Sequence, residues 1–310
     1  MHHDGGGRRW ILLRSAAMLR GSFPALRPGI EVGSYQLTEF IGYGCGLGAD
    51  IWRASRKSDS FILYFYFVLV SGGPVGRDVY VQAFLRDQAS ACKLLRHQGL
   101  HRPIEVRADH DPPFVVLPDL KSGDGEMLDA RMQRAPLSVR QALGIGTDLL
   151  DVLGYLHARG MLFLSGPPPS QVWLRRDGHA VAMPRPTLIA YPRGRRKAFP
   201  EAAFARCAPE TLGRDMADEL TDLYSLGILL YELLAGALPF AEEKDHRPRL
   251  TSLLKEPIPP LRVRGAVADV APGVQRLIDK SVARERECRF QSAAEMRSAV
   301  VQLASALEQG

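Results

Sequence analysis

Short runs of β-branched and aromatic residues dominate the first third of the chain, and Gly clusters or polar turns separate them. Such runs are typical of strands in a meandering sheet. Five strands are predicted: Tyr35–Ile41, Ile51–Ser55, Phe61–Val70, Ile104–Val106 and Phe114–Leu117. Between the third and the fourth, apolar residues recur at three- and four-residue spacing over Asp78–His97, which predicts a helix. This part of the chain therefore predicts a sheet with one helix.

After Leu120 the pattern becomes helical. Four helices are predicted: Ser138–Arg159, Glu219–Ala235, Gln275–Val282 and Ala293–Leu307. The first has its apolar residues on one face, and the second is almost continuously apolar, as expected of a buried central helix. Val172–Leu174 and Ala180–Ala182 flank Asp177-Gly178, a turn signal that predicts a hairpin. The pattern thus predicts a β-rich lobe followed by a mainly helical lobe.

The composition is that of a globular protein. The chain has 310 residues, of which 46% are hydrophobic, so intrinsic disorder is excluded for the chain as a whole. The length allows one large domain or two lobes. Residues 1–33 are rich in Gly, Arg and Pro and lack a sustained period, which predicts a flexible basic leader.

Several features favour a cytoplasmic protein without a membrane span. The longest apolar run, Phe61–Val70, is too short to cross a bilayer. The apolar stretch after Trp10 is interrupted by Arg14 and has no convincing cleavage site, so we reject a signal peptide. The four cysteines show no Cys-x-x-Cys spacing, which argues against a zinc site or a disulfide framework and fits a reducing compartment.

The net charge of +6 is unevenly distributed. Residues 1–36 carry five Arg and two acids, and residues 185–206 carry six basic residues and one acid. Seven of the 40 basic residues are Lys, the rest are Arg, and Asn is absent, a pattern that nucleotide bias of the genome would produce. The two basic segments lack interleaved aromatic residues, so nucleic acid is not an expected partner.

Several later motifs resemble those of the protein kinase family, and in particular bacterial Ser/Thr kinases. The motifs are Cys207-Ala-Pro-Glu210, Thr221–Phe240 with its Asp and Gly-x-x-Pro-Phe exit, Arg289-Phe290, Phe84-Leu-Arg-Asp87 with Leu94-Leu-Arg-His97, and Tyr155–Gly160. The resemblance implies an α+β, two-lobed kinase-like fold. The expected domain spans 34–305, with an N-lobe over 34–119, a C-lobe over 120–305 and a tail over 306–310.

The resemblance assigns structural roles to four charged residues. It pairs Arg289 with the carboxylate of Glu210, and it makes Asp222 the buried acid of the central helix. Asp87 takes the place of the small-lobe helix Glu, although a solvated surface acid explains it as well. Gly44, Gly46 and Ile51 fit a degenerate Gly-rich loop that would bind the cofactor. A register from Gly42, or a plain Gly-rich hairpin, remains an alternative.

The residues that phosphoryl transfer requires are missing from the matching positions. No Lys occurs between Lys57 and Lys93, and Tyr64 or Tyr66 stands near the family's strand Lys. Ser165 stands at the catalytic base, and Ser170 or Gln171 at the metal-binding Asn. Pro184 stands at the metal-binding Asp. From Met161 to Pro200 the only carboxylate is Asp177, in the predicted hairpin turn. We therefore expect no catalytic residue and no metal site.

The expected activation segment also lacks the residues through which phosphorylation regulates a kinase. It has no Ser or Thr between Leu188 and Glu210, and Leu164 replaces the family's phosphate-reading Arg. A basic run stands there instead, with candidate partner-binding residues Arg193, Arg195, Arg196 and Lys197. It would dock an acidic or phosphorylated segment, although a solvated loop would look the same.

Together these features predict a pseudokinase, a kinase-like domain that acts as a binding, scaffold or allosteric module. Its expected partner is another protein, such as an active kinase. No cofactor is expected, although weak metal-independent binding of ATP stays open. The alternatives are a divergent active Ser/Thr kinase that transfers the γ-phosphate of ATP, and a non-catalytic nucleotide sensor. They differ in whether ATP is turned over, or is bound without turnover.

Overall fold

The computed structural model describes most of the chain as two compact units. Among the described residues, those up to Lys93 and Pro103–Asp119 form unit 1, whereas Leu94–Arg102 and those from Leu120 onward form unit 2. The described residues are 26–44, 49–66, 69–70, 73–74, 93–120, 124–134, 137–163, 166–183, 206–212, 218–241, 251–253, 255–262 and 271–309.

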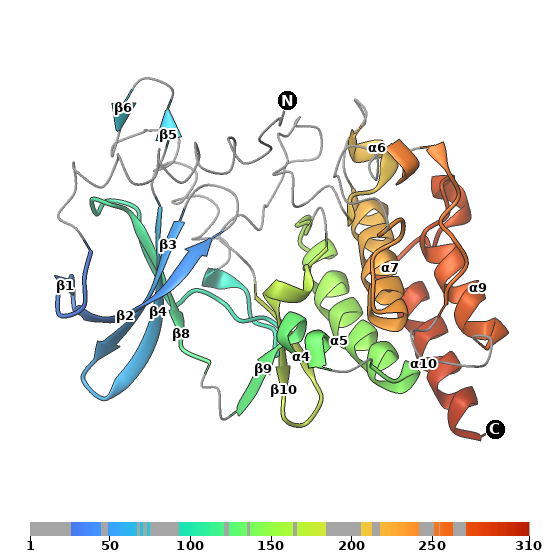
Figure 1. Cartoon of the computed structure of the whole chain (residues 1–310), viewed down its shortest axis with the longest axis horizontal. Coiled ribbons are helices and arrows are strands. Elements are labelled where there is room, and N and C mark those ends of the chain that lie inside the picture. The colour runs from blue at the N-terminus through green and yellow to red at the C-terminus, as the bar shows by residue number, and fades with distance from the viewer. Residues whose placement is uncertain are drawn as a thin grey trace, which may run out of the picture. The chain divides into compact units, whose positions relative to one another are not determined.

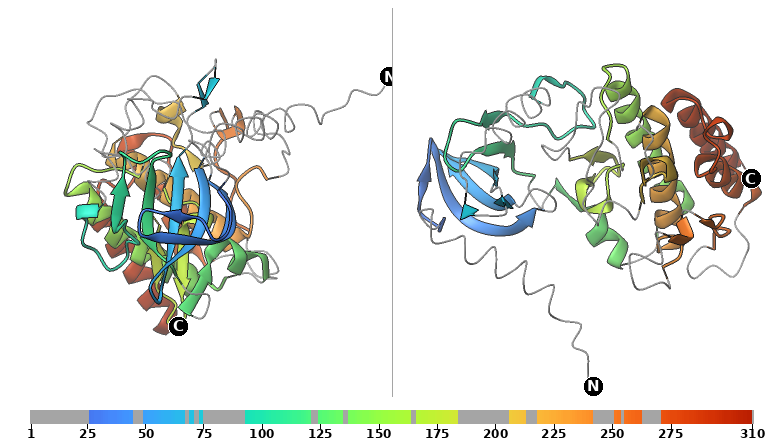
Figure 2. Two further views of the ribbon diagram at one scale, coloured as in Figure 1. Left: turned by 90° about the vertical axis from the view of Figure 1, so that its left-hand side faces the viewer. Right: turned by 90° about the horizontal axis from the view of Figure 1, so that it is seen from above.

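Unit 1 is built on an antiparallel sheet in the order β1-β2-β3-β4-β8-β7 (Figures 1 and 2). Its strands are β1 (Glu31–Val32), β2 (Tyr35–Gly44), β3 (Ala49–Arg56), β4 (Asp59–Tyr66), β7 (Glu105–Arg107) and β8 (Phe114–Pro118). A separate two-stranded pair consists of β5 (Leu69–Val70) and β6 (Gly73–Pro74). A strand forms in each of the five predicted places, and the sheet gains the short β1.

The core of unit 1 lies on one face of this sheet. Trp52 pairs with Leu63, and Leu63 pairs with Val116, so these side chains share a face because side chains alternate along a strand. They belong to a buried cluster against which Leu26 and Ile30 pack. The predicted leader over 1–33 is therefore too long, since its last residues cover the core and β1 pairs with β2.

Two elements predicted for the first lobe end earlier than expected. The run Phe61–Val70 does not form one strand, because β4 ends at Tyr66 and β5 belongs to the separate pair. Most of the predicted helix over Asp78–His97 lies outside the described residues, but its end is visible after Leu94. There the backbone N–H of Arg96 donates to the Tyr155 hydroxyl at 2.7 Å, instead of continuing a helical ladder.

Unit 2 combines a small sheet with packed helices (Figure 1). The sheet, in the order β11-β10-β9, consists of β9 (Gly125–Met127), β10 (Val172–Arg175) and β11 (Ala180–Ala182). The helices are α4 (Leu128–Arg134), α5 (Val139–His157), η3 (Pro169–Gln171), α6 (Pro209–Leu212), α7 (Glu219–Ala235), α9 (Pro272–Ser281), η5 (Arg286–Cys288) and α10 (Ala293–Gln309). The predicted hairpin is β10–β11, and α10 includes most of the predicted tail.

The sequence explains where the two long central helices begin and end. Ser138 caps α5 in a capping box with Gln141, and Asp218 caps α7 in the same way with Thr221. Gly236 ends α7 in a left-handed conformation at φ 72°, which glycine adopts without a steric penalty. Helix α7 is buried along its length and packs against α5 and α9. In the described part of the chain, no helix is long and apolar enough to cross a bilayer.

Candidate functional site

The sheet face opposite the unit 1 core carries Tyr64, one of the two residues expected near the family's strand Lys. On this face Tyr64 pairs with Ile51 on β3 and with Val115 on β8. Ile62, two residues earlier on β4, pairs with Leu117. Tyr64 and Ile51 are half-buried, and Val115 is fully buried. This register places the ring of Tyr64 among aliphatic side chains, so the described residues paired with it on this face carry no positive charge.

One basic side chain does lie on the same face of β3. Arg53 pairs with Ile62 across the strands, but its charge is already matched. Its Nε donates to Asp119 at 2.9 Å, and its Nη1 forms an ion pair with Glu39. Because two carboxylates neutralise this guanidinium, Arg53 does not replace the missing Lys.

In unit 2 the buried acid of α7 holds the start of the expected catalytic loop. The Asp222 carboxylate is fully buried, and its Oδ2 accepts a hydrogen bond from the backbone N–H of Phe163 at 2.8 Å. The same oxygen lies 3.0 Å from Nε2 of His157 at the end of α5. A buried carboxylate needs such partners. The structure thus brings Asp222 to the loop, in a positioning role.

The described residues of this loop, 161–163 and 166–171, are largely apolar and rich in proline, and they contact α7. Gly166 has φ +59°, and a Cβ there would lie 3.1 Å from Cβ of Ser225. Gly166, Pro167 and Pro169 are buried, and proline fixes its own φ. The described part of the loop is therefore stiff and uncharged.

A backbone hydrogen bond joins Gln171, just before β10, to Met183, just after β11. The N–H of Met183 donates to the carbonyl of Gln171 at 2.7 Å, and Met183 directly precedes Pro184. Gln171, which with Ser170 is one of two candidates for the family's metal-binding Asn, therefore lies beside the residue that precedes the expected position of the metal-binding Asp.

Asp177 has a structural role in the β10–β11 turn. Its Oδ1 accepts a hydrogen bond from the backbone N–H of His179 at 3.1 Å, and its Oδ2 lies 2.7 Å from Nη2 of Arg175. Gly178 completes the turn at φ +87°. Among the described residues, no group of three or more His, Cys, Asp or Glu side chains could hold a metal ion.

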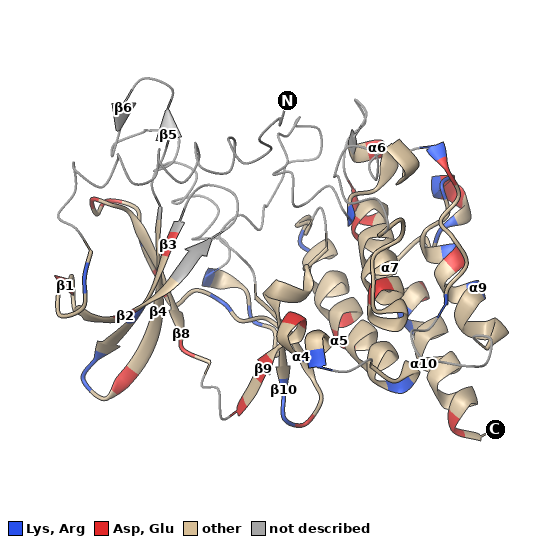
Figure 3. Cartoon of the chain, viewed as in Figure 1, with Lys and Arg blue, Asp and Glu red and all other residues tan. Residues whose placement is uncertain are grey.

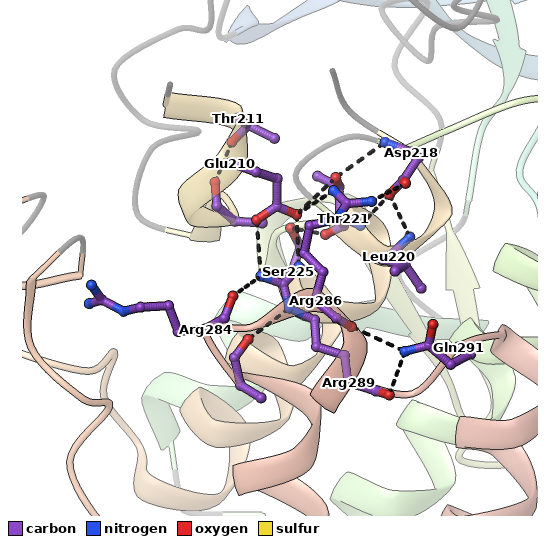
Figure 4. A network of polar contacts seen from close by, with 12 residues as sticks. Glu210, Thr211, Asp218, Leu220, Thr221, Ser225, Arg284, Arg286, Arg289 and Gln291 are labelled. Carbon is purple, nitrogen blue, oxygen red and sulfur yellow. Dashed lines mark hydrogen bonds and ion pairs between the residues drawn. The ribbon is translucent and has the colours of Figure 1, made fainter. Parts of the chain in front are cut away.

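The structure brings together the predicted ion pair of Glu210 and Arg289 (Figure 4). Nη1 and Nη2 of Arg289 donate to the two carboxylate oxygens at 2.7 and 2.9 Å. The guanidinium also donates to the carbonyls of Ala283 and Arg284 and lies 4.8 Å from the centre of the Tyr224 ring. Its side chain is fully buried, and these contacts satisfy the charge.

A second arginine, which sequence reasoning missed, extends this network. Arg286 forms an ion pair with Asp218, the cap of α7, and its Nη1 lies 3.4 Å from Glu210. Burial alone would raise the pKa of Glu210, but hydrogen bonds from Arg289 and the charges of both arginines lower it on balance. The network ties α6, α7 and the segment before α10 together (Figure 4). The N-cap pattern of Asp218 was the one available sequence signal.

The remaining predicted site residues are only partly visible. Gly44 ends β2 and pairs with Ala49, and Ile51 pairs with Gly42 in the same ladder. The following lie outside the described residues: Gly46, Asp87, Ser165, Pro184, Arg193, Arg195, Arg196 and Lys197.

A cavity of about 400 Å³ lies elsewhere in unit 2. Its walls include Pro209, Tyr224, Leu253, Ile258 and Val282. None of the described residues of the proline-rich loop lines it, so it is separate from the degenerate phosphoryl-transfer positions.

The fold is that of a protein kinase domain. The crystal structure of the Mycobacterium tuberculosis PknI kinase domain matches with a TM-score of 0.62 and 18% identity, over 90% of this chain and 99% of that one. A single-site mutant of the same kinase domain matches with a TM-score of 0.64 and 18% identity, over 91% and 100%. No family model matches the sequence.

The sequence is similar to bacterial serine/threonine protein kinases. It is 24% identical to serine/threonine-protein kinase PknB of Mycolicibacterium smegmatis over 278 residues, which cover 87% of this chain and 43% of that protein. It is 27% identical to serine/threonine-protein kinase Pkn1 of Myxococcus xanthus over 284 residues, covering 88% and 38%. The chain thus spans about two fifths of the length of these relatives. This part of the relatives is similar to the present chain, which has the fold of a protein kinase domain.

Proposed function

We propose that this kinase-like domain is a pseudokinase that acts as a binding, scaffold or allosteric module. The observation that carries the proposal is that Asp177 is engaged in structural contacts. It is the only carboxylate between Met161 and Pro200, and it is engaged in the β10–β11 turn. The expected base and metal positions therefore have no carboxylate of their own.

The expected loss of phosphotransfer rate favours a pseudokinase over an active kinase. Removing one preorganised electrostatic group typically costs about 10²–10³ in rate. Here the strand Lys, the base Asp, the metal Asp and the metal Asn are all replaced. Such losses are not additive, but the described residues contain no group of three or more His, Cys, Asp or Glu side chains that could hold a metal ion instead. By contrast, Glu210, Asp222 and Arg289 keep the contacts that stabilise the large lobe.

A phosphotransfer assay tests the loss of catalysis. The purified chain is incubated with labelled ATP and Mg²⁺, with and without a generic basic protein substrate, and we expect no label above the protein-free background. The matched variants are Asp177→Asn and Asp87→Asn, which would remove the two candidate acids. Label incorporation that either variant abolishes would overturn the proposal in favour of a divergent active Ser/Thr kinase.

Thermal unfolding with ATP separates a scaffold from a nucleotide sensor. Ligand that binds the folded state raises the melting temperature. A scaffold predicts no shift at millimolar ATP, with or without Mg²⁺. A shift that persists with EDTA supports metal-independent ATP binding and the sensor alternative, and a Mg²⁺-dependent shift contradicts the proposed loss of the metal site.

The proposal also covers the partner and the location. The run from Arg193 to Lys197 is proposed to dock another protein, through an acidic or phosphorylated segment. The cysteine pattern supports a cytoplasmic location. Pull-down with the chain and with a variant in which Arg195 and Arg196 are both changed to Glu tests the first point. Partners retained by the variant would contradict it.

A further inference from the structure

The segment Glu256–Arg262 has a backbone conformation that its sequence largely fixes. It reads Glu-Pro-Ile-Pro-Pro-Leu-Arg. Proline holds its own φ near −65°, and the residue before a proline is pushed into the extended region. Every residue from Glu256 to Pro260 is a proline or precedes one. The segment therefore favours a polyproline II helix, which has three residues per turn, and the structure assigns it neither helix nor strand.

Exposure along the segment follows the same period of three. Pro257 and Pro260 share one edge, and both are exposed. Ile258 and Leu261 share the second edge, where Ile258 is half-buried and Leu261 is 5% exposed. The third edge carries Pro259, which is half-buried between the exposed Glu256 and Arg262. One edge is thus packed into unit 2, whereas the other two are largely exposed, with Glu256 and Pro257 at the wall of the cavity described above.

Hydrogen bonds hold both ends of the segment in place. Nη2 of Arg284 donates to the carbonyl of Glu256 at 3.2 Å. The N–H of Leu261 donates to Oε1 of Gln275 on α9 at 2.9 Å. A segment that is already ordered loses little conformational entropy when a partner binds it. The fold therefore holds these prolines in a preorganised conformation for binding.

We propose that Glu256–Arg262 is a docking ligand for a partner domain with an aromatic-lined, polyproline-binding groove. Such grooves accept Pro-x-x-Pro segments through two outward edges. Here Glu256-Pro257 and Pro259-Pro260 supply the two dipeptides. Arg262 is exposed and forms no ion pair with any residue that the structure describes, so it would meet a carboxylate beside the groove. The surface does not depend on ATP turnover, and the proposal goes beyond the loss of catalysis.

The experiment titrates the purified full chain with an isolated SH3 domain whose groove carries an acidic pocket. Isothermal titration calorimetry measures the Kd. The test variants are Pro260→Ala and Arg262→Glu, both on outward edges. The matched controls are Pro272→Ala and Arg276→Glu, an exposed proline and an exposed arginine elsewhere. We expect the wild type and both controls to bind with the same Kd, and each test variant to bind about tenfold more weakly.

Three results would overturn the proposal. They are an SH3 domain that does not bind the chain, test variants that bind as well as the wild type, and controls that lose as much affinity as the test variants. A synthetic peptide of residues 255–263 shows whether the sequence can bind when free. If the peptide binds and the chain does not, the fold does not present the segment. The phosphotransfer assay is a separate readout, so failure of this proposal leaves the proposed loss of catalysis standing.

Discussion

At the scale of single residues, the buried charge of Arg289 has the clearest energetic consequence. A buried ion pair is often no more stabilising than a well-packed apolar pair, but removing one partner leaves the other charge buried and unmatched. Glu210 is only 6% exposed in its side chain, and Arg289 is not exposed at all. The second arginine of the network, Arg286, is 33% exposed, so water can solvate much of its charge.

This contrast gives the first prediction of stability. Arg289→Met should lower the free energy of unfolding by about 3–5 kcal/mol, because it strands the Glu210 carboxylate. Arg286→Met, the matched control in the same network, should cost about 0–1 kcal/mol, as expected of a more exposed pair. Urea unfolding followed by circular dichroism measures both. Equal losses of unfolding free energy would mean that burial does not determine how much each arginine contributes to stability.

The same residues show which side-chain contacts could be predicted from the sequence. The pairing of Glu210 with Arg289 could be predicted, because both belong to motifs of a known family. The ion pair of Arg286 with Asp218 could not, since it depends on how the turn before α10 meets the start of α7. The strand Lys position could be narrowed only to Tyr64 or Tyr66, which share one face of β4 and both pair with β3, so the register of the strands does not choose between them.

At the scale of elements, close approach between helices depends on small residues. Helix α7 packs on α9, and a Cβ at Gly227 would lie 2.6 Å from Cβ of Ser281 and 3.0 Å from Cγ1 of Val282. Neither neighbour is the free end of a flexible side chain. Gly144 on α5 offers the opposite case, since a Cβ there would meet nothing within 4 Å.

The two glycines therefore predict changes of opposite sign. Gly227→Ala should destabilise the chain by about 1–3 kcal/mol, because the added methyl overpacks the contact of α7 with α9. Gly144→Ala should stabilise it by about 0.5–1 kcal/mol, because alanine favours an open helix position. Differential scanning calorimetry would show melting temperatures shifted in opposite directions. A stabilised Gly227→Ala variant would show that the helices can move apart without cost.

Long periodic elements could be predicted, and several short ones without a turn signal or a β-branched run could not. Helix α7 has the predicted bounds, Glu219–Ala235, because a long apolar run ends at a capping glycine. Helix α4 was missed because only Leu128 is buried among its seven residues, so it has no apolar stripe. Strands β1 and β9 have two and three residues, too few for a period, and form only through pairing with β2 and β10.

At the scale of the whole molecule, charged residues of both units take part in ion pairs that stabilise the fold. In Figure 3, acidic and basic residues are interspersed over the described parts of both units. Several of these charges pair with each other, as Arg53 does with Asp119 and Arg206 with Glu232. The sequence alone showed that Asp177 is the only carboxylate between Met161 and Pro200. The engagement of the remaining acid, Asp177, needed the structure.

The charge network also predicts how stability depends on pH. The pKa of Glu210 is lowered in the folded chain, since its arginine partners outweigh the opposing effect of burial. The folded state therefore binds fewer protons than the unfolded state just below the ordinary value of 4.5. Stability from this group is fully present above that pH and is lost as the pH falls through the lower folded pKa.

Melting temperatures of the wild type and of Glu210→Gln between about pH 3 and pH 7 test this origin. The variant should be less stable at neutral pH and should show a shallower loss of stability on acidification, because it has no proton to bind at this site. Glu295→Gln is the control. The pKa of Glu295 is also lowered, by its hydrogen bond from Lys280, but both side chains are more than two fifths exposed, so solvent screens the pair. Its acid slope should stay close to that of the wild type. If Glu210→Gln keeps the full slope, then other carboxylates set the acid stability, and the buried network contributes to folding without contributing to its pH dependence.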